Sequence, residues 1–154
     1  MKGNEKVIET LNTQLADELS AVNQYIVHAE MAANWGYEKL HEAIQKRAID
    51  EMKHAEMLIE RILFLEGTPV VSNLNQLHIG EEVEKQFKND WQAERDAITT
   101  YNEGIDLCFK SGDHGTEQLF KTILKDEEDH LDWLEAQQDQ IKQVGIQNYL
   151  AAQV

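Results

Sequence analysis

Apolar residues recur every three or four positions through most of the chain, a spacing that predicts amphipathic helices. Four short stretches interrupt this pattern: NWGY (34–37), EGTP (66–69), SGDHG (111–115) and Gly145. Glycine and proline in such stretches are strong signals for helix ends. The pattern therefore predicts four long helices, followed by a short fifth helix in the tail after Gly145. We expect the long helices over residues 4–33, 38–66, 81–110 and 116–144.

The lengths of the connections predict how these helices are arranged. The first and second helices, and the third and fourth, are separated by about five residues, which favours antiparallel neighbours. The segment GTPVVSNLNQLHIG (67–80) separates the second and third helices. Extended at about 3.3 Å per residue it reaches roughly 46 Å, whereas a helix of about 28 residues is roughly 42 Å long. The segment can therefore run the length of a bundle and leave these two helices parallel.

Together these features predict an all-α fold in a single domain, residues 1–154. We expect a four-helix bundle with one long crossover and a short fifth C-terminal helix. The apolar residues of the crossover are expected to pack along the outside of the bundle. They are Val70, Val71, Leu74, Leu77 and Ile79.

Glutamate interrupts the apolar stripe of each long helix near its middle, and in two helices a histidine follows three residues later. These inward-facing residues are Glu18, Glu51, His54, Glu94, Glu127 and His130. An offset of three places both side chains on one helical face, one turn apart. Glu18 precedes Glu51 by 33 residues, and Glu94 precedes Glu127 by the same 33. The chain therefore contains two related helical hairpins, each with a lone glutamate and a Glu-x-x-His pair.

This polar set predicts a dinuclear metal site. Four buried carboxylates without counter-charge repel one another strongly, whereas two divalent cations balance their charge and the imidazoles supply neutral nitrogen donors. A single Glu-x-x-His pair is often only a solvated helix face, but two such pairs on apolar stripes favour metal binding. This is the established ligand layout of di-iron and di-manganese carboxylate bundles, applied here to a new sequence. Oxygen and nitrogen donors without thiolate favour iron or manganese, with zinc as an alternative.

Two tyrosines lie on the same stripes as the glutamates. Tyr25 is two turns from Glu18, and Tyr101 is two turns from Glu94. Tyr25 is a candidate hydrogen-bond donor near the metal ligands, or an electron source when two ferrous ions react with O₂. An ordinary core tyrosine is an equally good interpretation, and both interpretations apply to Tyr101 as well.

Met52 lies on a different face of its helix, about 100° around from Glu51. It is in line there with Ile49, Glu56, Ile59 and Leu63. One bundle cannot bury both faces, so we expect this second face to meet another subunit. Met52 is then a packing residue at that interface, although a thioether can also ligate haem iron, and the spacing does not decide between the two.

Charge and composition narrow the classes of function. The chain has 29 acidic and 14 basic side chains, a formal net charge of -15. This balance argues against binding to a nucleic-acid phosphate backbone and favours attraction of cations. A solvated acidic surface with no binding role is the simpler interpretation of the net charge. The single cysteine, Cys108, excludes a disulfide framework within the chain. With no visible signal peptide and no apolar run near the roughly 20 residues of a membrane span, we expect a cytoplasmic protein without membrane or nucleic-acid partners.

Several stretches match the motifs of one family. They are MKGNEKVIETLN, AVNQY, NWG, IDEMKHAE, RILFLEGTP, DEEDHLDWLE and GIQNYLAAQ. On these stretches the chain resembles bacterioferritins over essentially its whole length. The resemblance implies a ferritin-like bundle and a shell of 24 subunits built from two-fold dimers. It also implies an iron-storage ferroxidase, an enzyme that oxidises Fe²⁺ with O₂ or H₂O₂ and stores the ferric mineral inside the shell.

The resemblance assigns roles to individual residues. By resemblance, the ferroxidase ligands of a di-iron site are Glu18, Glu51, His54, Glu94, Glu127 and His130. Glu51 and Glu127 would bridge the two irons. The family further implies haem b, one per two subunits, with Met52 of both subunits as the axial ligands. A ferredoxin-type electron donor for iron release is implied as well, and a shell that mixes this chain with a haem-free type is an alternative to a homo-oligomer.

Other functions fit the sequence less well. A rubrerythrin-type peroxide scavenger usually carries an additional cysteine-rich iron domain, and this chain has one cysteine. A monooxygenase or ribonucleotide reductase subunit is normally longer, and a DNA-protecting miniferritin does not place its ligands inside one bundle. A haem-carrying structural or electron-transfer protein, with a metal that only braces the bundle, is an alternative from a different class.

Overall fold

Five helices account for nearly the whole chain. The computed structural model describes residues 1–154. The helices are α1 (Glu5–Asn34), α2 (Glu38–Phe64), α3 (Val83–Lys110), α4 (His114–Val144) and α5 (Ile146–Ala151). No residue lies in a β-strand, so the predicted all-α fold with a short fifth helix is confirmed. None of the helices combines the length and the apolar character that crossing a bilayer requires.

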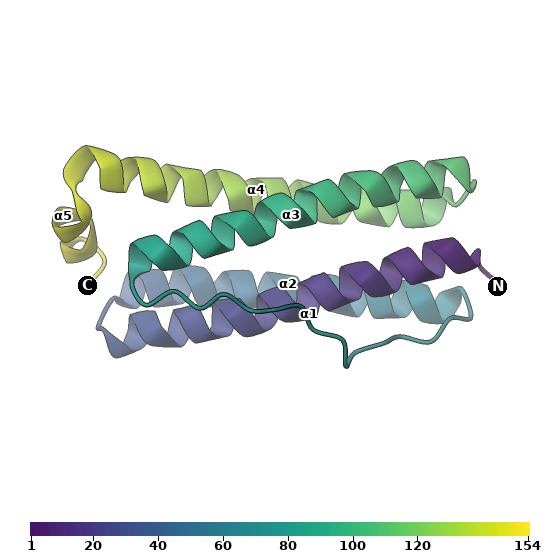
Figure 1. Cartoon of the computed structure of the whole chain (residues 1–154), viewed down its shortest axis with the longest axis horizontal. Helices are drawn as coiled ribbons and strands as arrows, with labels where there is room; N and C mark the ends of the chain where they lie inside the picture. Colours follow the sequence, from purple (N-terminus) through teal and green to yellow (C-terminus); the bar gives the residue numbers. More distant parts are fainter.

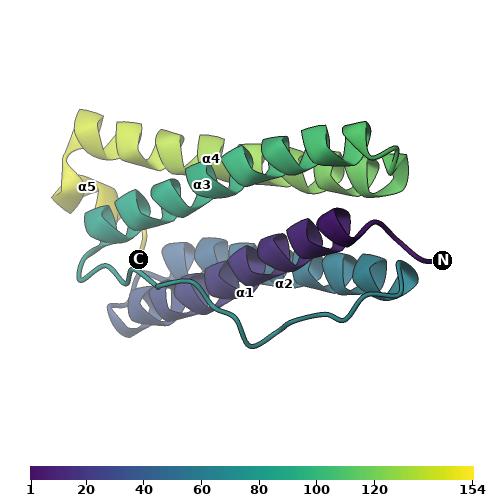
Figure 2. The same cartoon turned by 45° about the vertical axis from the view of Figure 1, so that its right-hand side comes forward.

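The four long helices form two antiparallel hairpins that pack into one bundle (Figure 1). α1 packs chiefly against α2 and α3 against α4, while contacts of α1 with α3 and of α2 with α4 join the hairpins. The crossover, residues 65–82, runs along one side of the bundle from the end of α2 to the start of α3, as Figures 1 and 2 both show. α2 and α3 are therefore parallel, as the length of the crossover predicted.

The helix ends lie within two residues of the predicted bounds. α2 ends two residues earlier, at Phe64, and α3 begins two residues later, at Val83. α4 begins at His114, inside the predicted break, because Asp113 caps it: its Oδ1 accepts a hydrogen bond from the N–H of Thr116 at 2.9 Å. The breaks in the apolar pattern thus predicted the turns, and side-chain caps mark the starts of α1, at Asn4, and α4, at Asp113.

The apolar core consists of two clusters, one toward each end of the bundle. The N-end cluster contains Val7, Leu11, Leu15, Ala55, Leu58, Ile62, Leu65, Tyr101, Cys108, Phe120 and Ile123. The C-end cluster contains Tyr25, Ala29, Ala32, Leu40, Ile44, Ala48, Val83, Phe87, Leu134, Ile141 and Tyr149. Each large apolar side chain in them contributes about 1.5–3 kcal/mol through burial. Between the two clusters, buried polar side chains from all four long helices fill the middle of the bundle.

The apolar residues of the crossover pack less completely than predicted. Val70 and Leu77 are half-buried against the bundle. Val71, Leu74 and Ile79 are 58%, 49% and 41% exposed. The prediction was therefore wrong for these three residues, because the crossover leaves more than 40% of each side chain in contact with solvent.

Candidate metal centre

The six polar residues predicted from the apolar stripes meet in the middle of the bundle. Every long helix contributes to the set of Glu18, Glu51, His54, Glu94, Glu127 and His130. All six are buried, with relative exposures between 0% and 8%. The structure thus brings together every residue that the sequence pattern placed in the site.

The donor atoms of these residues form two overlapping groups, each within 4.8 Å. One group contains Glu18, Glu51, His54 and Glu127, and the other contains Glu51, Glu94, Glu127 and His130. Glu51 and Glu127 belong to both groups, so their carboxylates are positioned to bridge two ions. His54 Nδ1 lies 3.0 Å from Glu51 Oε2 and 3.1 Å from Glu127 Oε1. His130 Nδ1 lies 2.9 Å from the other Glu51 oxygen.

Two aspartates that the apolar pattern did not reveal face the imidazoles from outside. His54 Nε2 lies 3.0 Å from Asp126 Oδ2, and His130 Nε2 lies 3.5 Å from Asp50 Oδ2. Donation of Nε2–H to a carboxylate leaves the Nδ1 lone pair directed at the carboxylate cluster, which is how a histidine is oriented to ligate a metal. A signal was available in the sequence. Each aspartate directly precedes a stripe glutamate, so the segment Asp-Glu-x-x-His occurs twice, 76 residues apart.

The two tyrosines are paired with the glutamates across the bundle. The hydroxyl of Tyr25 donates a hydrogen bond to Glu94 Oε1 at 2.6 Å, and the hydroxyl of Tyr101 donates to Glu18. Each tyrosine therefore contacts the lone glutamate of the other hairpin rather than the one on its own helix. Burial raises the pKa of both phenols, and the neighbouring carboxylates raise it further. Both hydroxyls consequently stay protonated and act as donors.

Without a cation, the carboxylate cluster holds protons. Burial raises the pKa of Glu51 well above its usual range, and the charges of Glu18 and Glu94 add to this effect. Burial likewise raises the pKa of Glu127, with further contributions from neighbouring carboxylates. For His54, burial alone lowers the pKa, but hydrogen bonds to the surrounding glutamates outweigh burial and raise it. Metal ions that enter the centre must therefore displace protons.

Several buried atoms at the centre lie close to another donor or acceptor but lack the geometry of a hydrogen bond. They are Glu51 Oε1, Glu94 Oε2, Glu127 Oε1 and His130 Nδ1. An unpartnered buried polar atom costs about 1–3 kcal/mol, so a cluster of them requires compensation. Two divalent cations with oxygen and nitrogen ligands provide it, since the unpartnered atoms belong to the two donor groups.

Comparison with known proteins agrees with this geometry. Residues 8–144 match the family described as a ferritin-like domain. The chain is 43% identical over 149 residues to the bacterioferritin of Brucella melitensis biotype 1, covering 97% of this chain and 92% of that protein. The chain belongs to the bacterioferritin family. Identity is 40% to the bacterioferritins of Rhodobacter capsulatus, over 97% of this chain and 92% of the relative, and of Streptomyces coelicolor, over 98% and 90%.

A second buried network in this bacterioferritin-family chain anchors the crossover. His28 Nε2 accepts a hydrogen bond from the N–H of Gly80 at 3.0 Å, and its Nδ1 lies 3.1 Å from Asp90 Oδ2. Gln24 donates to the other Asp90 oxygen at 2.8 Å and accepts the N–H of His78 at 3.1 Å. This network holds the last part of the crossover against α1 and α3. Sequence reasoning missed it, because polar residues beside an apolar stripe look like part of a solvated face.

Met52 is separate from the metal centre, on the outside of α2. It is 45% exposed, and the nearby helix position Ile49 is 42% exposed. On α1, Ile26 is 48% exposed. Both helices of the first hairpin thus expose large apolar side chains, and the thioether of Met52 is among them.

Proposed function

We propose that this bacterioferritin-family chain is an iron-storage ferroxidase that oxidises Fe²⁺ to Fe³⁺ within each subunit, with O₂ or H₂O₂ as the oxidant. One observation carries this proposal: the two buried donor groups overlap through Glu51 and Glu127. Two Fe²⁺ ions that share these two carboxylates can together deliver two electrons to one oxidant molecule. Membership of the bacterioferritin family supports storage as the fate of the ferric product.

The chain's own residues would bind the two substrate ions and manage the protons. Each Fe²⁺ would be bound by one terminal glutamate and one histidine, with Glu51 and Glu127 shared. Tyr25 and Tyr101 fix the orientation of the terminal carboxylates through their hydrogen bonds. Entry of the cations displaces the protons that the shared glutamates hold, so binding releases H⁺ and weakens as the pH falls.

We further propose that the chains form a shell of 24 subunits, built from two-fold dimers, around stored ferric mineral. Haem b would lie on the two-fold axis with Met52 of both subunits as ligands, because a two-fold axis presents the same residue twice. The exposed thioether among apolar side chains supports this assignment. When bound, haem supplies one-electron transfer between the mineral and a ferredoxin-type donor. A mixed shell and a cytoplasmic location stay predictions from the sequence.

The ferroxidase proposal is tested by loading anaerobic protein with two Fe²⁺ per chain, adding O₂, and recording absorbance and oxygen consumption. A rapid phase is expected that disappears in Glu18→Ala and Glu127→Ala, since each variant loses a ligand. Glu128→Ala is the matched control, because Glu128 is exposed on the same helix. No rapid phase in the unmodified protein, or a normal one in both ligand variants, would overturn the proposal.

The haem assignment is tested by the visible spectrum of the purified assembly. A Soret band with one haem per two chains is expected, and Met52→Leu should abolish it while the mass by size exclusion is unchanged. A Soret band that survives in Met52→Leu would assign the haem to other residues.

A further inference from the structure

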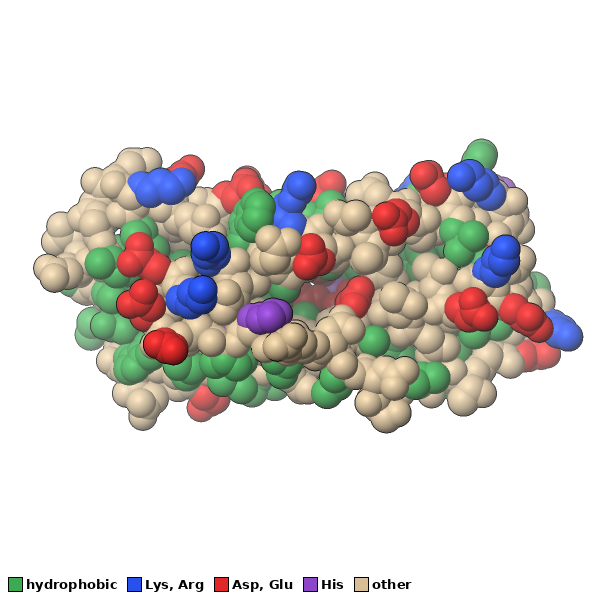
Figure 3. All heavy atoms as spheres, in the orientation of Figure 1, with side chains coloured by type: hydrophobic (Ala, Val, Ile, Leu, Met, Phe, Trp, Pro, Cys, Tyr) green, Lys and Arg blue, Asp and Glu red, His purple; other side chains and the backbone are tan.

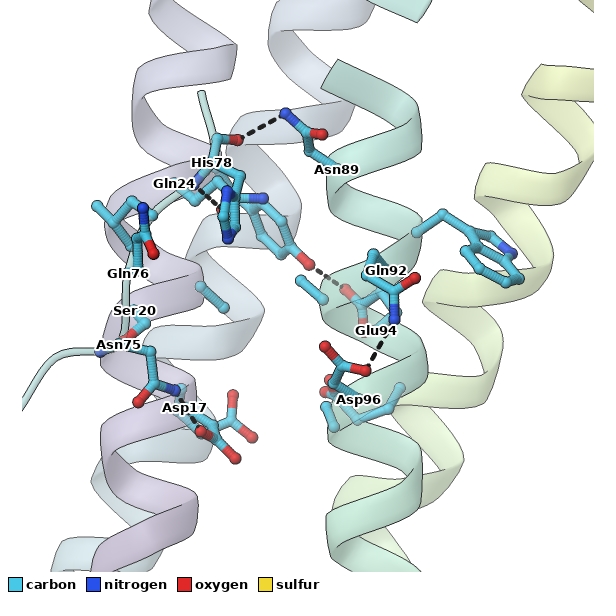
Figure 4. Close-up of a pocket in the computed structure, with 18 of the residues that line it drawn as sticks. Asp17, Ser20, Gln24, Asn75, Gln76, His78, Asn89, Gln92, Glu94 and Asp96 are labelled. Carbon is cyan, nitrogen blue, oxygen red and sulfur yellow. Dashed lines mark hydrogen bonds between the residues drawn. The ribbon is translucent and has the colours of Figure 1, made fainter. Parts of the chain in front are cut away.

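The metal centre has two unlike sides. On one side, α1, α3 and the crossover line a cleft of about 650 Å³ that reaches Glu18 and Glu94. Figure 3 shows this face hollowed near the crossover, with acidic side chains around and inside the hollow, and Figure 4 shows Asp17 and Asp96 on opposite walls. α2 and α4 form the opposite side of the bundle (Figure 1). The charged side chain that joins these two helices there is basic, the buried Arg47 of α2.

Two contacts from α4 hold the side chain of Arg47, which is 9% exposed. Its Nη1 donates a hydrogen bond to the carbonyl oxygen of His130 at 2.9 Å, and its guanidinium carbon lies 4.8 Å from the centre of the Trp133 ring. A guanidinium is attracted to the face of an aromatic ring in this way. Because His130 and Trp133 are one helical turn apart, the positive charge is fixed beside the backbone of a candidate ligand.

The charge of Arg47 is not balanced by an ion pair. Arg61, on the same helix, pairs with Asp113 at 2.7 Å, whereas Arg47 pairs with no carboxylate and its buried Nε makes no hydrogen bond. A buried charge is unfavourable unless opposite charge lies nearby. Residues four apart on a helix are neighbours, with Cβ atoms about 5–6 Å apart, so Glu51 lies next to Arg47 on the buried face of α2. The carboxylate cluster of the metal centre therefore supplies the opposite charge.

The other half of the metal centre has no such charge. The residue that corresponds to Arg47, 76 positions later, is Ile123, and the residue that corresponds to Trp133 is Met57. Ile123 is 0% exposed and belongs to the N-end cluster, and Met57 packs against that cluster. An apolar pair thus occupies the place in one half that a cation and an aromatic ring occupy in the other.

We propose that Arg47 makes the His130 half the weaker of the two metal-binding halves, through a fixed positive charge that the His54 half lacks. Without metal, the guanidinium balances negative charge in the carboxylate cluster. Once divalent cations balance the carboxylates, the same guanidinium repels the ion beside His130, since like charges interact strongly in a buried site. This inference rests on the proposed function, because it concerns the second of the two Fe²⁺ ions that the ferroxidase binds.

The test is calorimetric titration of the metal-free assembled protein with Co²⁺, in which the unmodified protein is expected to bind two ions per chain in two steps. Arg47→Gln and Arg47→Met both remove the charge. Each is expected to strengthen the second step about tenfold and to leave the first within about twofold. Arg47→Lys keeps the charge and should resemble the unmodified protein. The matched control, Lys46→Gln, removes the same charge from the neighbouring exposed position, where solvent screens it, and should change neither step.

The sign of the change separates an electrostatic role from a purely structural one. If Arg47 only braces α4, every substitution loosens His130, and weaker binding in all three variants would overturn the inference. An unchanged second step in both charge-removing variants, equal strengthening of the two steps, or a stronger second step in Arg47→Lys would overturn it as well, while the ferroxidase proposal stands. Fewer than two Co²⁺ bound by the unmodified protein would overturn the proposed centre itself. A stronger second step in the charge-removing variants alone supports the role of Arg47.

Discussion

The two halves of the metal centre have the same ligands but unequal support. A lone glutamate, a tyrosine and an Asp-Glu-x-x-His segment occur in each half, at an offset of 76 residues. His54 is 2% exposed, and its Nε2 lies 3.0 Å from Asp126. His130 is 8% exposed, its Nε2 lies 3.5 Å from Asp50, and its Nδ1 lacks hydrogen-bond geometry to any partner.

A repeat in the sequence therefore determines which side chains are present but not how firmly each one is held. A separation of 3.0 Å is normal for a hydrogen bond, whereas 3.5 Å is at its outer limit. Asp126 therefore orients its imidazole more strictly than Asp50 does. We expect the His54 half to bind its ion more tightly, and the His130 half to fill second and empty first.

Replacing either histidine should have the largest effect on metal binding and on the rate of oxidation. His54→Ala and His130→Ala each remove a ligand that belongs to one donor group only. Each variant is expected to bind about one ion tightly, and the rapid O₂-dependent phase should slow at least about 100-fold, because two electrons require two ions. Titration with Co²⁺ and stopped-flow oxidation measure the two effects. Two tightly bound ions in either variant would contradict the division of the ligands into two groups.

Substituting the two aspartates should weaken metal binding by different amounts. Asp126→Asn is expected to weaken metal affinity by about 10-fold to 100-fold, and Asp50→Asn by less than about tenfold, because the longer contact contributes less orientation. Isothermal titration with Co²⁺ gives both affinities. Asp129→Asn serves as the control, since Asp129 is exposed on α4 and pairs only with Lys125. Equal losses in the two variants would show that the halves are equally supported.

The tyrosine pair should respond more evenly than the aspartate pair. Tyr25→Phe and Tyr101→Phe each remove a buried hydrogen bond to a carboxylate. Each is expected to lower the free energy of unfolding of the metal-free protein by about 1–3 kcal/mol, as measured by urea denaturation at fixed protein concentration. Tyr37→Phe, at a half-buried position outside the centre, is the control. A lower free energy of unfolding in only one of the two variants would show that the two tyrosine–glutamate hydrogen bonds contribute unequally.

The smallest expected effect is the pH dependence of stability without metal. The pKa values of Glu51, Glu127 and His54 are raised in the folded chain, from ordinary values of 4.5 for the glutamates and 6.5 for the histidine. Groups with a raised pKa stabilise the fold fully below the ordinary value and lose that contribution as the pH rises. The melting temperature of the metal-free protein should therefore fall by about 5 °C between pH 5 and pH 8.

Two comparisons isolate the source of this pH dependence. Glu51→Gln, which has no carboxyl group to titrate, should flatten the melting curve against pH. Addition of Co²⁺ should reverse the trend in the unmodified protein, because metal binding strengthens as protons leave. The lowered pKa of Glu94 acts in the opposite sense, but only below its ordinary value of 4.5. An unchanged slope in Glu51→Gln would place the effect outside the metal centre.

Much of the fold and of the candidate site could be predicted from the sequence, since burial leaves a periodic signal. A glutamate such as Glu51 in an otherwise apolar stripe is conspicuous, and all six candidate ligands were found in this way. Asp50 and Asp126 were not, because a partly exposed aspartate beside the stripe looks like a solvated residue. The partners of Tyr25 and Tyr101 could not be predicted either, since they depend on how α1 packs against α3.

The separation of the apolar core into an N-end and a C-end cluster has a consequence for turnover. Most of the buried apolar surface lies toward the two ends of the bundle, so we expect the chain to stay folded when its middle holds no metal ions. Under the proposed function, Fe²⁺ would bind in the middle, be oxidised and leave while both end clusters stay packed. With an apolar cluster toward each end, the bundle can lose the metal ions from its centre repeatedly without unfolding.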